Sequence, residues 1–191
     1  SAISASPVEI AANYAQTAHN IHLKQDQLKE IETALNRIDS NLKRPLFTIC
    51  ITDAVCRKES IENWDKNRML TDICGHELRK IIDKIENKND KEYVEDLLCF
   101  ATMIGGLKYS APESAPKSIQ EAYRKFGRKI KSLFHTINGF DSEYLYPLEP
   151  DILGEQFVLE YLKEIPKTVR NEWIQTSWKC EPKKFSYFLM R

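Results

Sequence analysis

Apolar residues recur at steps of three and four along most of this chain, and this period constrains its fold more than any other feature. Leu28, Ile31, Leu35 and Ile38 form one such run, with Lys, Glu and Gln side chains among the residues between them. This spacing places the apolar side chains on one face of an α-helix. Only 6 of the 191 residues are glycine, and Lys, Glu, Ile and Leu are common, which also favours helix over sheet. We therefore predict a mainly α-helical protein.

The same pattern predicts further helices, separated by recognisable breaks. Apolar side chains indicate helices near residues 7–19, 70–85, 94–104, 119–134, 151–165 and 169–178. Gly105 and Gly106 would end one helix, and Gly127 would either interrupt another or mark a tight contact between helices. The stretch YSAPESAPKS at 109–118 is typical of a linker, because it contains two prolines and three serines.

Two features depart from the helical pattern. The pair Asn138-Gly139 lies between β-branched and aromatic residues, which is typical of a tight β-hairpin turn. Pro45 stands directly before the apolar run LFTIC, with no turn residue after it. Proline fixes φ and has no N–H, so it fits the first turn of a helix and not its middle. We predict a hairpin at Asn138-Gly139 and a helix that begins at Pro45.

The charge and cysteine content argue against several classes of protein. The 28 basic and 28 acidic side chains give a formal net charge of zero, so no chain-wide attraction to nucleic acid or an anionic membrane is expected. Five cysteines without a CxxC pair predict reduced thiols in the core of a cytoplasmic protein. No apolar stretch approaches the roughly 20 residues of a membrane span.

Motifs for catalysis and metal binding are incomplete. HELRK at 76–80 begins like a zinc-protease helix, but Lys80 stands where the second histidine would be. His19 and His22 lie three residues apart without a carboxylate or cysteine at helical spacing, so we expect surface histidines and no metal site. GGLK lacks the Gly-Lys-Ser/Thr sequence of a phosphate loop. We predict that this chain has no catalytic residues and is not itself an active enzyme.

Arg124, Lys125, Arg128, Lys129 and Lys131 form a basic cluster just before the predicted hairpin. In a winged helix this is the position of the helix that reads DNA. The cluster also fits a solvated basic face, or a face turned toward nucleotide phosphates or another domain. Because acidic residues follow closely at 143, 149 and 151, we expect no DNA binding.

Three stretches resemble, in order, the STAND class of AAA-type NTPases, which are relatives of the NB-ARC and NACHT proteins. LKRPLFTICITDAV at 42–55, followed by ENWDKNRML, resembles the first helical lid, where bacterial members commonly have Arg-Pro-Leu. LLCFATMIGGL at 97–107 is similar to the start of the winged-helix part. YLYPLEPDILGEQFVLEYL at 144–162 is similar to the Pro-Leu-x-Pro-Asp-x-x-Gly-Glu stretch that leaves the wing.

The resemblance implies a mainly α fold in three parts. These are a helical lid subdomain at 7–108, a winged-helix-like subdomain with a small β-hairpin at 109–165, and the start of a helical connector at 166–191. Three residues of the last motif would be structural. Asp151 would cap its helix, Gly154 would allow close helix packing, and Glu155 would lie near the positive end of the helix.

The resemblance also implies a function in nucleotide-dependent switching. The chain would close over ATP or ADP bound by an upstream nucleotide core, which would hold the phosphate loop and the metal-binding acid. Pro45, with Arg44 beside it, would contact the adenine, and His135 would contact the β-phosphate of ADP. Two alternatives stay open, because Pro45 also fits a plain helix start, and the neighbours Phe134 and Ile137 also fit a buried structural histidine.

We accordingly expect a piece excised from a longer cytoplasmic ATPase of signalling or defence, which itself binds no nucleotide tightly. Its partners would be the upstream nucleotide core and a downstream sensor domain of the same protein, with homo-oligomers forming on activation and no membrane contact. The alternative function is that of a stand-alone helical module for protein interaction, or a winged-helix module for DNA binding.

Overall fold

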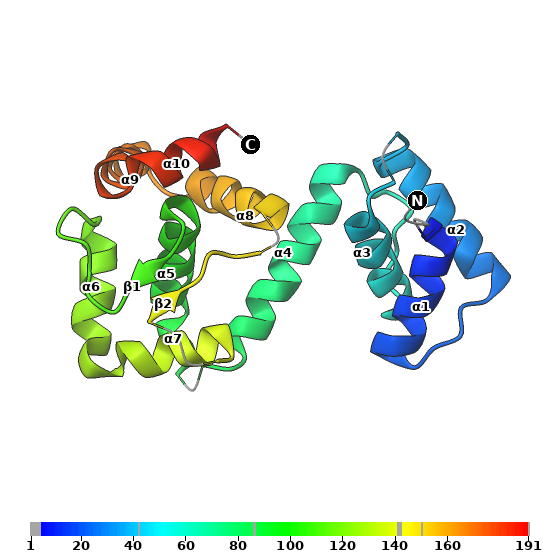
Figure 1. Ribbon diagram of the computed structural model, residues 1–191, viewed down its shortest axis with the longest axis horizontal. Coiled ribbons are helices and arrows are strands. Elements are labelled where there is room, and N and C mark those ends of the chain that lie inside the picture. The colour runs from blue at the N-terminus through cyan, green and yellow to red at the C-terminus, as the bar shows by residue number, and fades with distance from the viewer. Residues whose placement is uncertain (1–4, 42, 86, 141–142, 150, 191) are drawn as a thin grey trace. The chain divides into compact units, whose positions relative to one another are not determined.

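The computed structural model describes residues 5–41, 43–85, 87–140, 143–149 and 151–190. The chain divides into two compact units, Ser1–Ile73 and Cys74–Arg191, and Figure 1 shows the order of their helices. The division lies within helix α4 (Lys66–Ile82). It does not coincide with the predicted boundary after residue 108, because residues 91–104 pack against later helices of the second unit.

Three helices form the core of the first unit: α1 (Pro7–His19), α2 (Gln25–Ile38) and α3 (Pro45–Cys56). All three were predicted, α1 from its alanine-rich sequence, α2 from the apolar spacing and α3 from Pro45. Helices α1 and α2 both pack against α3, which buries most of its residues from Phe47 to Val55. A helix covered on more than one side is apolar around most of its circumference, which explains the nearly continuous apolar run after Pro45.

Helix α5 (Lys91–Ile104) is the central helix of the second unit. Every residue from Leu97 to Ile104 is buried, because several helices pack against α5. These are α6 (Lys117–Phe126), α8 (Asp151–Glu164), α9 (Lys167–Cys180) and α10 (Pro182–Leu189). Figure 1 shows α5 in the middle of this group. Helix α10 was not predicted. It begins at Pro182, which occupies the first helical position.

Short helical turns complete the path of the second unit. The 3-10 turn η1 (Lys88–Asp90) leads into α5, and η2 (Gly127–Lys129) leads from α6 into α7 (Ile130–Asn138). Gly127 has a φ of +49°, and no described atom lies within 4 Å of the position that a Cβ on it would take. The predicted interruption of the helix at Gly127 is therefore confirmed, and the alternative of a tight helix–helix contact is wrong.

The predicted hairpin at Asn138-Gly139 is wrong. Asn138 is the last residue of α7, and Gly139 ends that helix with a φ of +79°. Instead, strands β1 (Leu107–Lys108) and β2 (Tyr144–Leu145) pair antiparallel although α6 and α7 separate them in the chain. A helix end and a tight hairpin turn both require a residue at positive φ. The apolar helical spacing up to Ile137 decides between them.

Helix α8 packs closely because of Gly154. A Cβ at this position would lie 2.6 Å from the carbonyl oxygen of Leu148 and 2.9 Å from the side chain of Thr102 in α5. The predicted role of Gly154 is therefore confirmed. Asp151 is the first residue of α8, so its carboxylate belongs to the positive end of the helix. The residue before it lies outside the described residues, so the predicted cap stays a prediction.

The central helix α5 carries a buried carboxyl group. The side chain of Asp96 in α5 is buried, and the hydroxyl of Tyr161 in α8 donates a hydrogen bond to its Oδ1. Burial raises the pKa of Asp96 above its usual range, although the Tyr161 bond acts in the opposite direction. The pair ties α8 to the central helix.

The sequence also led to predictions about the cysteines and about membrane-spanning helices. The five cysteines are free thiols, and Cys50, Cys74 and Cys99 are buried, as predicted. Within the ranges that the structure describes, every helix is too short or too polar to cross a lipid bilayer.

Candidate functional site

The turn between α2 and α3 carries two of the predicted site residues, Arg44 and Pro45. Asp39 directly follows α2, and only 6% of its side chain is exposed. The Arg44 backbone N–H donates to Asp39 Oδ2 at 2.8 Å. The Arg44 guanidinium donates from Nε to Oδ2 and from Nη2 to Oδ1, both at 3.1 Å. A bidentate pair fixes direction as well as distance, so Asp39 locks this turn.

Two further contacts shape the same turn. Lys43 has a φ of +44°, a region that side-chain-bearing residues seldom adopt, and its N–H donates to the carbonyl oxygen of Asp39 at 3.0 Å. The guanidinium carbon of Arg44 lies 4.5 Å from the centre of the Phe47 ring, which is fully buried. The charge-assisted hydrogen bonds and the contact with the ring offset the strain at Lys43.

The Asp39–Arg44 pair is charged at neutral pH. Hydrogen bonds from the Arg44 side chain lower the pKa of Asp39, although burial acts in the opposite direction, and the same bonds raise the pKa of Arg44. The Arg44 side chain is 40% exposed. Arg44 thus stabilises the turn. A contact of Arg44 with nucleotide would have to use the edge of its guanidinium that Asp39 and Phe47 do not cover.

Pro45 is the first residue of α3 and is exposed. The prediction that a helix begins there is confirmed. The N–H groups of Phe47 and Thr48 donate to the carbonyl oxygen of Arg44 at 3.0 and 3.2 Å, so the first turn of α3 closes directly behind the proline. Pro45 has no N–H, which would lack a partner at this position in any case. Its ring therefore presents a rigid apolar face to solvent, beside the braced Arg44.

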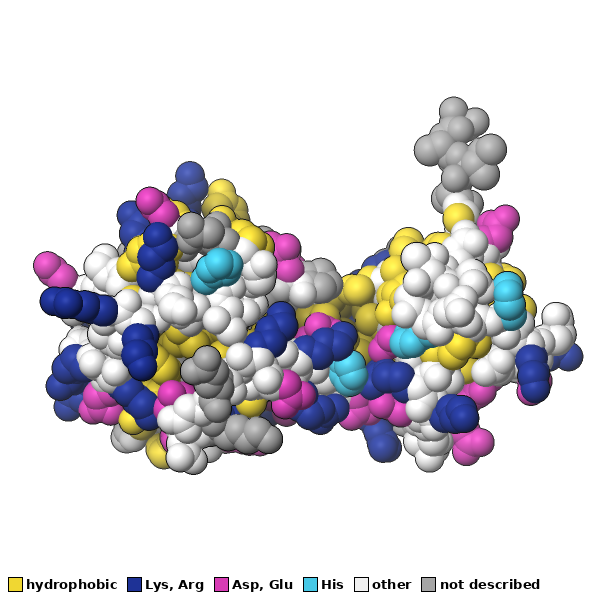
Figure 2. Space-filling model, turned by 90° about the horizontal axis from the view of Figure 1, so that it is seen from below, with side chains coloured by type: hydrophobic (Ala, Val, Ile, Leu, Met, Phe, Trp, Pro, Cys, Tyr) yellow, Lys and Arg dark blue, Asp and Glu magenta, His cyan; other side chains and the backbone are white. Residues whose placement is uncertain are grey.

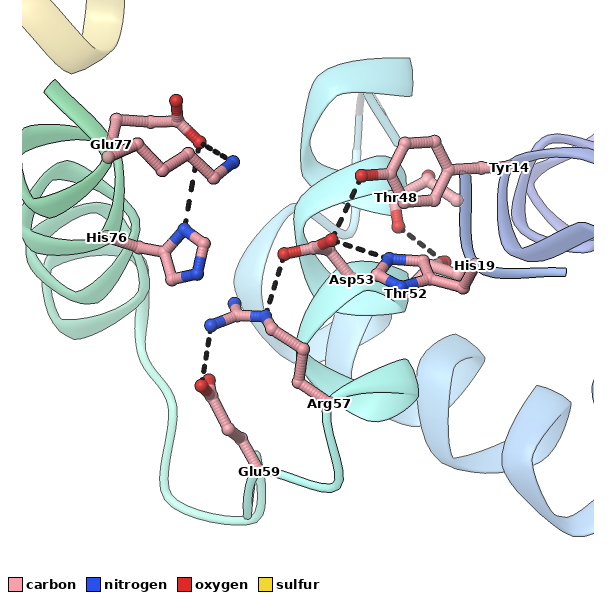
Figure 3. A network of polar contacts seen from close by, with 10 residues as sticks. Tyr14, His19, Thr48, Thr52, Asp53, Arg57, Glu59, His76 and Glu77 are labelled. Carbon is pink, nitrogen blue, oxygen red and sulfur yellow. Dashed lines mark hydrogen bonds and ion pairs between the residues drawn. The ribbon is translucent and has the colours of Figure 1, made fainter. Parts of the chain in front are cut away.

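A second cluster of polar side chains joins α1 to α3 (Figure 3). Asp53 Oδ1 accepts a hydrogen bond from the Tyr14 hydroxyl at 3.0 Å and lies 2.8 Å from His19 Nε2. The other oxygen of Asp53 lies 2.9 Å from Arg57 Nε. Arg57 in turn donates from Nη1 to the Glu59 carboxylate at 2.6 Å. Tyr14 and His19 come from α1 and Asp53 from α3, and Figure 3 shows them pointing toward one another.

The donors around Asp53 keep it ionised. Burial opposes its ionisation, but hydrogen bonds from His19 and Tyr14 and the charge of Arg57 hold its pKa below the usual range. Burial and the hydrogen bond to Asp53 raise the pKa of Tyr14 to about 12. A carboxylate with so many donors is a poor proton acceptor. The cluster therefore fastens α1 to α3 and is not suited to general-base catalysis.

One expectation and one open alternative about histidines are wrong. The sequence suggested that His19 lies on the surface, but it is partly buried against Asp53. The sequence also left open that His135 is buried, but this histidine is exposed on α7. Arg44 and Pro45 are neighbours in the first unit, whereas His135 belongs to the second. Among the residues that the structure describes, no group of three His, Cys, Asp or Glu side chains is placed to hold a metal ion.

The basic cluster occupies the end of α6, the turn η2 and the start of α7. At least three of its members have local partners, and one of them is Arg124, whose Nε donates to the Gln120 carbonyl oxygen at 3.5 Å. Lys125 Nζ lies 2.6 Å from Asp90 Oδ1 and 4.3 Å from the centre of the Tyr93 ring, and Lys131 Nζ lies 5.6 Å from the centre of the Tyr109 ring. Figure 2 shows Lys and Arg side chains spread over the second unit with carboxylates between them. The surface in this view is mixed in charge and has no single basic stripe.

Sequence reasoning missed Asp39, Tyr14 and Asp53. Asp39 stands five residues before Arg44, and this spacing by itself marks no known motif. Asp53 gave a clearer signal, since it is the one charged residue of α3. A lone carboxylate in an otherwise apolar and covered helix requires hydrogen-bond donors from a neighbouring element, although the sequence does not say which.

Comparisons of the chain with protein-family models, with curated proteins and with solved structures find no match.

Proposed function

We propose that this chain is the regulatory lid and winged-helix part of a STAND-type NTPase switch. It would close over ADP or ATP bound by an upstream nucleotide core of a cytoplasmic protein. By opening when the nucleotide is exchanged, it would control oligomerisation or the release of an effector domain. A ligand shifts such an equilibrium only through different contacts in the two states, and Pro45 and His135 are the residues proposed to make those contacts.

The observation that carries this proposal is the exposed ring of Pro45 on a locked turn. A proline that only started a helix would need neither the Asp39–Arg44 pair nor the strained Lys43 before it. An adenine ring is flat and largely apolar on its faces, so a rigid proline face can pack on it without leaving an N–H unsatisfied. The locked turn holds that face in one position, which lowers the entropy cost of binding.

The order of elements in the second unit supports the winged-helix part of the proposal. Helix α5 is followed by β1, then by α6 and α7 joined through a short turn, and then by β2, which returns to pair with β1. This order is similar to that of a helix-turn-helix domain with a strand on either side, and under the proposal the wing would be reduced to the single strand β2. His135 is exposed on α7, so it is accessible to the predicted phosphate contact.

A direct test is calorimetry of this chain with ATP. Because the sequence contains no phosphate loop, the proposal expects no measurable heat of binding at micromolar concentrations and no ATP hydrolysis. Micromolar affinity for ATP in this chain would contradict the lid assignment. In the full-length protein, a Walker A motif upstream of residue 1 would support it.

A second candidate function is DNA binding through α7. The observation in its favour is the basic residues of the turn between α6 and α7, where Arg128 and Lys129 are exposed. The ion pair between Lys125 and Asp90 argues against DNA binding. We expect no shift of a generic DNA duplex in a gel at about physiological salt, where nonspecific binders typically have Kd values of about 10⁻⁴ to 10⁻⁶ M. A shift that disappears in a variant with Arg128→Gln and Lys129→Gln would favour this second function.

A further inference from the structure

The second unit contains an open pocket of about 500 Å³ beside the end of α7. Its deep part is aliphatic, because Leu98 of α5, Ile137 of α7 and Leu148 line it and are each buried. Ile81 of α4 completes this apolar lining. The volume lies within the range of about 300 to 1,000 Å³ that is usual for ligand sites.

Two aromatic side chains stand at the mouth of this pocket. Phe140 is 54% exposed and Tyr146 is 47% exposed, and their ring centres lie 5.7 Å apart. Asn138 holds the backbone next to the Tyr146 ring, because its amide nitrogen donates to the Tyr144 carbonyl oxygen at 2.7 Å. Its amide oxygen accepts the Tyr146 N–H at 3.3 Å. Tyr146 therefore stands on a fixed support, and the Asn138 amide is already used.

The charge at the mouth of the pocket is negative. Glu149 is exposed and is the charged side chain among the described lining residues, which include no Lys, Arg or His. The N–H of Leu148 points away from a ligand, because it donates to the hydroxyl of Thr102 at 3.1 Å. The polar group that a ligand would meet in this pocket is thus the Glu149 carboxylate. It accompanies two aromatic rings whose faces also attract cations.

We propose that this pocket binds an arginine side chain that a partner protein presents next to an apolar residue. The planar guanidinium can stack on Phe140 or Tyr146 while it donates to the Glu149 carboxylate. The apolar neighbour enters the aliphatic part of the pocket. A protein segment fits better than a free small molecule, because two rings that are about half exposed need a wider surface to cover them. This proposal does not depend on the nucleotide switch.

The test is NMR titration of this chain with two short peptides, acetyl-Leu-Arg-Leu-amide and its neutral citrulline analogue. The arginine peptide should bind with a Kd on the order of 1 mM, which is typical of a contact this small. The shifted amide signals should be confined to the residues that line the pocket, which are Ile81, Leu98, Ile137, Asn138, Phe140, Tyr146, Leu148 and Glu149, since Pro147 has no N–H. The citrulline peptide should bind at least about three-fold more weakly, since it lacks the charge.

Variants of the chain separate the pocket from general charge effects. Glu149→Gln and Phe140→Ala should each lower the affinity for the arginine peptide about three-fold. Because both residues are exposed, neither substitution should affect the fold. Glu143→Gln removes an exposed carboxylate of the same segment that does not line the pocket, and it should leave the affinity unchanged. Equal binding of both peptides, equal effects of the two glutamate variants, or no shifts at about 10 mM peptide would each overturn the proposal.

Discussion

Replacing Asp39 by asparagine should loosen the first unit much more than removing an exposed carboxylate from it. Asparagine keeps the size of the side chain but loses the charge, and its NH2 group faces the donors of Arg44. Hydrogen bonds to charged groups contribute roughly 1.5 to 3 kcal/mol each. Because Arg44 is 40% exposed, water recovers part of this loss. We expect a destabilisation of about 2 kcal/mol, which is roughly 30-fold in the opening equilibrium.

The assay is native-state hydrogen exchange followed by NMR at pH 7. Amides in the core of α2 and α3 should exchange roughly 30-fold faster in Asp39→Asn, while amides of α5 in the second unit serve as an internal reference. The control is Asp72→Asn, since Asp72 is 48% exposed and lies 4.0 Å from an exposed Arg68. This control should change stability by less than about 0.5 kcal/mol. A change below about three-fold in α3, or an equal change in α5, would show that Asp39 does not stabilise the first unit through Arg44.

The pH dependence of this effect follows from the lowered pKa of Asp39. A carboxyl group whose pKa is lower in the folded chain adds stability above its unfolded pKa of about 3.9. This contribution is lost as the pH falls through the folded value. The difference between the native chain and Asp39→Asn should therefore be constant from about pH 8 to pH 5 and should shrink below about pH 4.

Two further substitutions test the packing of each unit. Asp53→Asn should weaken the hold of α3 on α1 by about 2 kcal/mol, because Asp53 takes contacts from Tyr14, His19 and Arg57. Unchanged hydrogen exchange of the α1 amides would contradict this role. Gly154→Ala should destabilise the second unit by about 1 to 3 kcal/mol, because its Cβ would lie 2.6 Å from the Leu148 oxygen. Gly75→Ala in α4 is the control, since the nearest atom there is 3.8 Å away on a flexible side chain, and equal melting temperatures for the two variants would contradict the packing argument.

Most of the helices could be predicted from the sequence because they carry their own apolar pattern, and α10 is the exception. Pro45, Gly105 and Gly127 also marked helix ends correctly, since their backbone requirements are local. The division of the chain could not be predicted in the same way. Whether α5 belongs with the helices before it or after it depends on which apolar faces meet, and α5 is apolar around most of its surface.

The errors at Asn138 and His19 have a common physical cause. Asn138-Gly139 by itself fits a hairpin turn and a helix end equally well, and the partner of the following strand β2 is the distant β1, at Leu107 and Lys108, and not the segment directly before Asn138. His19 was read as a surface residue because its partner Asp53 lies 34 positions away. The ion pair between Asp39 and Arg44 could not be predicted from the sequence either, although the two residues are close in the chain. Local patterns indicate which residues form a helix but not which buried charges meet.

The proposed contact of Pro45 with adenine can be tested by the ADP affinity of the full-length protein with Pro45→Ala. We expect a loss of about 1 to 3 kcal/mol, or roughly 5- to 150-fold, from the lost ring contact and the new N–H beside the base. The melting temperature of the nucleotide-free protein should change little, because alanine is a good helix former. Pro7→Ala is the matched control, since Pro7 also occupies the first turn of a helix, and it should leave ADP affinity unchanged. Equal ADP affinity in Pro45→Ala and the native protein, with both folded, would contradict the claim and leave Pro45 as a helix start alone.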